Sequence, residues 1–82
     1  MTDDLKSAIS LALTGEWDQA HIIVQELGSP TAAWIHAVLH KIEGDESNSR
    51  YWYARTHGRH YEDYADPQAE LRAIAGHLET EG

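Results

Sequence analysis

Apolar residues recur every three or four positions along most of this 82-residue chain, and this helical spacing is the strongest constraint on its fold. Leu5, Ile9 and Leu13 form one such stripe, and another runs from Leu71 to Leu78. No segment alternates apolar and polar residues over the length of a strand. The pattern therefore predicts an all-α fold with one small core.

Glycine and proline divide the chain into separate helices. Ser29-Pro30 and Asp66-Pro67 are strong start signals, because the polar side chain caps free N–H groups and proline has no N–H to lose at the first helical position. We expect helices over residues 3–13, 16–27, 30–43, 46–55 and 67–79. They make one domain, with a first helix pair at 1–28, a second at 29–56, a connector at 57–66, and a capping helix and tail at 67–82.

Composition excludes several classes of function. The chain has no cysteine, which rules out disulfides and thiolate chemistry. Its formal net charge of −8 repels phosphate, so we expect no nucleic-acid partner. No apolar run approaches the ~20 residues of a membrane span, and the start of the chain is acidic where a signal peptide is basic. We therefore expect an acidic cytoplasmic protein that does not enter a membrane.

The chain also carries an internal repeat. A shift of about 29 positions places Gly15–Ala20 on Gly44–Ser49, and the flanking apolar positions agree in pattern. The order Gly15, Trp17, Ala20, Leu27 and Pro30 resembles the second half of a tetratricopeptide repeat. The second unit lacks the aromatic residue after its Gly-acid turn, and its spacing is shorter than the family's ~34 residues.

The resemblance implies a protein-interaction scaffold whose first helices line a concave face and whose last helix caps the array. On this interpretation the chain binds a protein partner or a second copy of itself, without a cofactor. The residues expected on that surface are Trp34, Val38, Tyr51, Trp52 and Arg55. The string from Trp34 to Asp45, with the aromatic run at 51–53, is also similar to a group of short bacterial and fungal proteins that bring no established activity.

Histidine spacing supports a different class of function. His36 and His40 are four positions apart and Glu43 is three further on, so all three project from one side of a helix. This set could hold Zn²⁺ or another divalent first-row ion, with His57 or His60 completing the shell. The string is not the zincin motif, because alanine follows His36 where that motif has glutamate.

The same two histidines also fit a purely structural role. The repeat alignment turns His36 and His40 toward the fourth predicted helix and its aromatic run, where packed rings would bond a carboxylate or carbonyl. The sequence contains no recognisable pairing of a nucleophile with a base and no glycine-rich phosphate loop, so we assign no catalytic residue. An interaction module is the leading interpretation, and a metal-binding protein or small metalloenzyme is the alternative.

Overall fold

The fold is all-α, as the apolar spacing predicts. The computed structural model describes residues 2–81, and in that range it contains helices and no strand. The helices are α1 (Thr2–Leu13), α2 (Trp17–Gln25), α3 (Pro30–Ile42), α4 (Glu46–Tyr53) and α5 (Pro67–Glu81), with a 3-10 turn, η1 (Tyr61–Asp63), in the predicted connector. Among these residues no helix is long and apolar enough to cross a bilayer.

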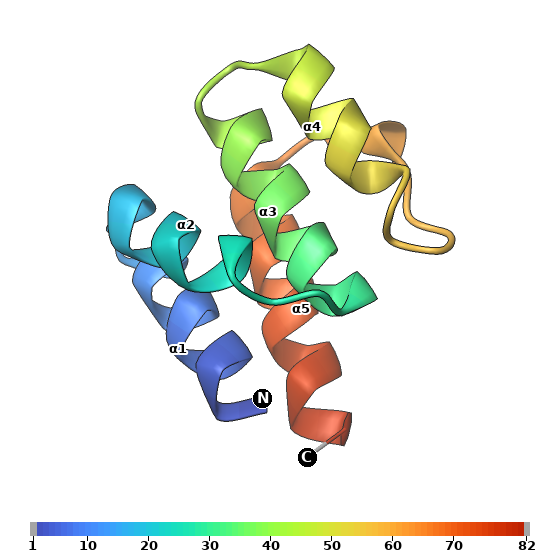
Figure 1. Ribbon diagram of the computed structural model, residues 1–82. Helices are drawn as coiled ribbons and strands as arrows, with labels where there is room; N and C mark the ends of the chain where they lie inside the picture. The colour runs from blue at the N-terminus through green and yellow to red at the C-terminus, as the bar shows by residue number, and fades with distance from the viewer. Residues whose placement is uncertain (1, 82) are drawn as a thin grey trace.

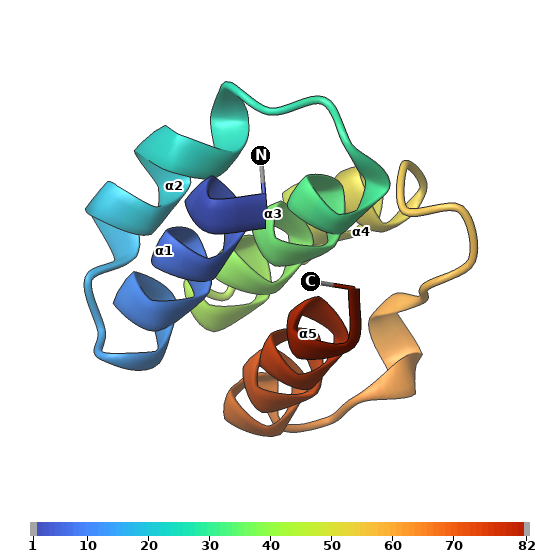
Figure 2. The same ribbon diagram turned by 90° about the horizontal axis from the view of Figure 1, so that it is seen from below.

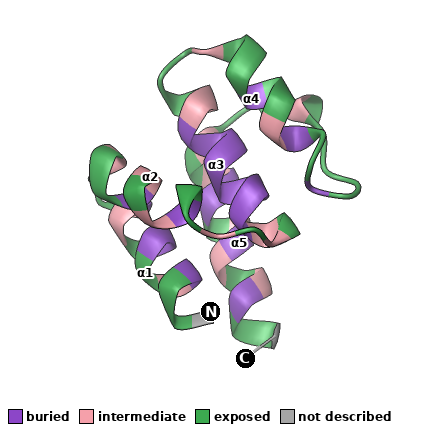
Figure 3. Cartoon of the chain, viewed as in Figure 1, coloured by how far each residue is buried: buried purple, intermediate pink, exposed green. Residues whose placement is uncertain are grey.

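Helix α3 is the centre of the molecule (Figure 1), and it contacts α1, α2, α4 and α5. Viewed from below, the other helices surround it (Figure 2). Every residue from Ala32 to Leu39 is buried, and Figure 3 shows this burial as an almost continuous purple stretch. Over these residues the helix has almost no solvent-exposed surface to present to a partner.

The local signals for helix ends act as the sequence predicts. The Ser29 side chain accepts a hydrogen bond from the Ala32 N–H and Pro30 begins α3. The Asp45 side chain caps α4 in the same way, accepting from the Asn48 N–H. Gly15 and Gly44 both have a φ above +80°, which glycine adopts without strain. Helices α2 and α4 each end two residues before the expected position, at Gln25 and Tyr53, and α3 ends one residue before it, at Ile42.

Helix α5 packs against α1 and α3, the first helices of the two predicted pairs. These are the helices that the tetratricopeptide resemblance expects to line an open concave face. Because α5 lies on both of them, the chain closes into a bundle with extents of 29 × 25 × 23 Å. The arrangement of the helix pairs as stacked tetratricopeptide units stays a prediction.

A buried carboxylate attaches α5 to the rest of the bundle. Glu70 is fully buried, and it accepts hydrogen bonds from Trp34 Nε1 at 2.8 Å, Tyr53 OH at 2.6 Å and Lys41 Nζ at 2.8 Å. Burial and the neighbouring Glu70 carboxylate raise the pKa of the Tyr53 hydroxyl, so it stays a donor. This network joins α3, α4 and α5 through one side chain.

Candidate metal centre

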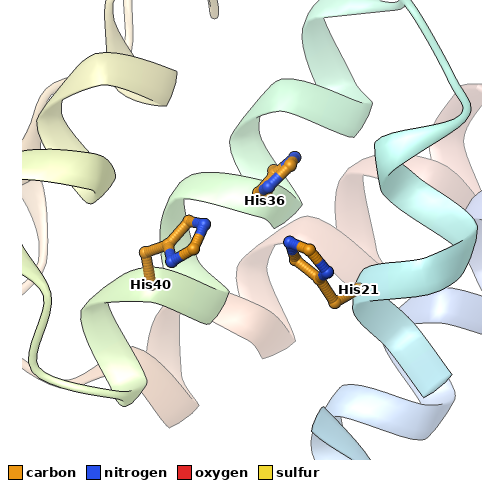
Figure 4. Close-up of side chains that lie close together, drawn as sticks. All are labelled: His21, His36 and His40. Atoms are coloured by element: carbon orange, nitrogen blue, oxygen red, sulfur yellow. The ribbon is translucent and has the colours of Figure 1, made fainter. Parts of the chain in front are cut away.

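Three histidines from two helices converge at the surface between α2 and α3. His36 and His40 lie one turn apart on α3, and His21 approaches them from α2 (Figure 4). One ring nitrogen from each of the three lies within 4.8 Å of the other two. The ring centroids of His21 and His36 are 4.6 Å apart, and those of His36 and His40 are 5.1 Å apart.

Two tryptophans fix the positions of these rings. Trp17 stacks on His21 with centroids 4.8 Å apart, and its Nε1 donates a 2.6 Å hydrogen bond to the Leu39 carbonyl. Trp52 stacks on His36 at 3.9 Å, nearly parallel. His36 thus faces α4, as the repeat alignment predicts. Each indole stacks face to face on an imidazole, and this contact fixes the ring without a hydrogen bond to its nitrogens.

Most of the ring nitrogens in the cluster are unused. Within residues 2–81, neither His21 nor His36 has a hydrogen bond, and no fully buried side-chain nitrogen or oxygen lacks a partner. The unbonded nitrogens of these two rings therefore border solvent. His40 differs, because its Nδ1 lies 2.7 Å from Glu43 Oε1. We assign the proton to Nδ1, which donates to the carboxylate and leaves Nε2 with a free lone pair.

The electrostatics of the cluster favour neutral imidazoles at His36 and His21. Burial lowers the pKa of His36, and with the smaller effects of the nearby His21 and His40 rings it falls from 6.5 to about 4. The pKa of His21 is also lowered, first by burial and then by His40. Neutral imidazole is the form that binds a metal ion, so His36 is ready to act as a ligand at neutral pH without losing a proton.

The separations are close to those of a metal site. Zinc–nitrogen bonds of ~2.0–2.1 Å place two ligand nitrogens about 3.4 Å apart in a tetrahedral shell. The nitrogen separations in the cluster are all within 4.8 Å, so they exceed this value by at most about 1.4 Å. Small side-chain rotations of His21 and His40, which are only partly buried, would close the gap.

The structure brings together some of the predicted ligands and separates others. His36 and His40 belong to the cluster, while Glu43 contacts the outer edge of the His40 ring. His57 and His60 are exposed in the connector and belong to neither donor group found in residues 2–81. The prediction that one of them completes the shell therefore has no support in this geometry.

His21 is the ligand that sequence reasoning missed. It lies four residues after Trp17, on the side of α2 that faces α3, and it reaches His36 and His40 only because these two helices pack together. Spacing within residues 16–27 does not show that contact. A second donor group, formed by His40, Glu43 and Asp45, lies at the turn between α3 and α4. Asp45 is committed there to capping α4, because its oxygens accept from Asn48 N and Nδ2 at 3.2 and 2.7 Å.

The fold buries some residues of the predicted partner surface and exposes others. Trp34 and Val38 are core residues, 4% and 0% exposed, because α3 is enclosed on all sides, and neither is free to contact a partner. Tyr51 is 51% exposed and Arg55 is exposed beside it, with Nη2 donating to the tyrosine hydroxyl at 2.6 Å. Trp52 is partly buried against His36.

Within residues 2–81 the donor group consists of three imidazoles, and the Glu43 carboxylate contacts the outer nitrogen of the His40 ring. Such a donor set suits a divalent first-row transition ion. Comparisons with models of protein families, with curated proteins and with solved structures find no match for this chain.

Proposed function

We propose that this protein binds a divalent first-row transition ion through His21, His36 and His40. One observation carries the proposal: three imidazoles from two helices converge within 4.8 Å, and the rings of His21 and His36 form no hydrogen bond to residues 2–81. A packed structural histidine normally bonds a carbonyl or carboxylate. Only His40 does so here, and it keeps its second nitrogen free.

The donor set limits which ion is bound. Neutral imidazoles suit Zn²⁺, Ni²⁺, Co²⁺ and Cu²⁺ and give no advantage to Mg²⁺ or Ca²⁺, which require oxygen ligands. Affinity across the first row is expected to follow the usual order, with Cu²⁺ tightest. We therefore propose a nitrogen-ligated site that binds copper, nickel or zinc in preference to manganese.

Calorimetric titration with Zn²⁺ and Ni²⁺ tests the proposal. We expect one ion per chain, with binding lost in His21→Ala and kept in His57→Ala, which replaces an exposed histidine outside the cluster. His21 is only partly buried, so its replacement leaves the core intact, and circular dichroism checks the fold. Absence of binding, or binding that His21→Ala leaves unchanged, would overturn the proposal.

Protein–protein interaction is the second candidate function. The exposed pair Tyr51 and Arg55 supports it, because an aromatic ring stacked with a guanidinium is typical of contact surfaces. Sedimentation at rising concentration tests self-association. A dimer that Tyr51→Ser dissociates would support a second copy as the partner, whereas a monomer at all concentrations would remove it.

A further inference from the structure

We infer that the bound ion keeps one coordination position open and binds a small anionic oxygen or nitrogen donor there, such as hydroxide, a carboxylate or azide. This inference rests on the proposed metal site. An ion with a complete shell of protein ligands would only link α2 to α3, whereas an ion with an open position also binds a ligand from solution. First-row ions in proteins carry at least four ligands, and a site with three protein ligands leaves the fourth to water or a substrate.

The described chain supplies no fourth ligand. Glu43 is the nearest carboxylate to the cluster, but it is bonded to Nδ1 of His40. Nδ1 and Nε2 point in diverging directions from an imidazole ring, so a carboxylate on Nδ1 lies outside the shell of an ion on Nε2. Asp45 is engaged with Asn48 as the cap of α4.

Charge makes the open position selective for anions. Three neutral imidazoles leave both positive charges of the ion uncompensated. Glu43 adds one negative charge, but it acts through the His40 ring and not on the ion directly. The ion is therefore short of negative charge in its first shell, and an anionic donor is bound more strongly than a neutral one.

A ligand from solution can reach the ion. His21 is partly exposed, and the His40 side chain is 12% exposed. The two stacked indoles, Trp17 and Trp52, lie against the His21 and His36 rings, leaving the unbonded nitrogens of His21 and His36 bordering solvent. The fourth position thus adjoins water and is not enclosed in the core.

Cobalt substitution provides the test. Co²⁺ is added to the full chain in a non-coordinating buffer, and its visible absorption bands are followed while azide replaces perchlorate at constant ionic strength. We expect the bands to shift with a single saturation curve, because azide enters the first shell. The same azide series on the Co²⁺-treated His21→Ala protein is the control, and it should give no such curve.

The outcomes separate this inference from the proposal beneath it. Bands that form with Co²⁺ but do not respond to azide or thiocyanate would show a closed shell, which overturns the open position and leaves metal binding standing. Absence of bands in the wild-type protein would overturn both. Relaxation of water protons by the Cu²⁺-loaded protein is an independent measurement, since azide should reduce it by displacing the exchangeable water.

Discussion

At the scale of single residues, the contact between Glu43 and His40 bears most directly on the metal centre. A carboxylate bonded to the outer nitrogen of a ligand imidazole fixes the tautomer and orients the ring toward the ion. The 2.7 Å separation of Glu43 Oε1 and His40 Nδ1 has this geometry before any ion is bound. In the proposed site Glu43 is therefore expected to position His40 and not to bind the ion.

Replacing Glu43 tests that role. We expect Glu43→Gln to weaken Zn²⁺ binding by about 10–100-fold, because the amide orients the ring less strongly and adds no negative charge. Glu26→Gln, the same change on an exposed carboxylate at the end of α2, should leave affinity unchanged. Competition against a chromophoric chelator measures the Zn²⁺ dissociation constant of each variant. Equal affinities for the two variants would show that Glu43 has no part in the site.

Glu70 connects three helices of the bundle through its side chain. Its carboxylate is fully buried and accepts from three side chains, so its removal leaves the Lys41 ammonium without its charged partner. We expect Glu70→Ala to lower the free energy of unfolding by about 3–5 kcal/mol. Glu79→Ala, which breaks an exposed pair with Lys6, should change it by less than ~1 kcal/mol. Urea denaturation measures the free energy of unfolding of both variants. Similar losses in the two would show that the buried network of Glu70 stabilises the fold no more than an exposed ion pair.

At the scale of elements, the turn between α3 and α4 requires a left-handed backbone conformation at Gly44. Gly44 has a φ of +83°, while Gly28 does not have a positive φ, and neither has an atom within 4 Å of an added methyl group. We expect Gly44→Ala to destabilise the fold by about 1 kcal/mol, because alanine is strained in the left-handed region. Gly28→Ala should be neutral or stabilise by up to ~1 kcal/mol. Thermal unfolding measures the difference, and equal midpoints for the two variants would refute it.

The element scale also shows what the sequence could predict. Helix starts depend on neighbouring residues, so Ser29-Pro30 marked the beginning of α3 correctly. The pairing of His36 with His40 followed from spacing within one helix. The third ligand, His21, depends on how α2 packs against α3, and no spacing within a single helix contains that information.

Trp34 and Val38 were predicted to lie on a partner surface, but they are buried, and the sequence could not show this for the same reason. An apolar stripe identifies a buried face, but it does not show how many neighbours enclose the helix. Helix α3 is covered by four others, including α5, which the repeat resemblance placed at the end of the array. Burial of α3 on all sides is thus a property of the tertiary arrangement, which local patterns do not contain.

At the scale of the whole molecule, acid should destabilise the fold through His36. Its pKa falls from 6.5 to about 4 on folding, so between these values the unfolded chain takes up a proton that the folded chain does not. Stability is therefore complete above pH ~6.5 and lost as pH falls toward 4. The loss is roughly 2 kcal/mol after allowance for partial solvent screening. The titratable groups that face the His36 ring are His21 and His40, and the lowered pKa of His21 acts in the same direction.

The net charge of the chain opposes this effect, which makes the comparison of variants decisive. The formal charge of −8 counts the six histidines as neutral, so their protonation reduces it to −8 + 6 = −2 and relieves self-repulsion. His36→Phe keeps a ring against Trp52 but removes the titrating group, so its stability should vary less between pH 6.5 and 4 than that of wild type. His57→Ala should retain the wild-type slope. Urea unfolding in the presence of a chelator measures all three. If His36→Phe lost stability with acid as steeply as wild type, the acid response would have to originate outside the histidine cluster.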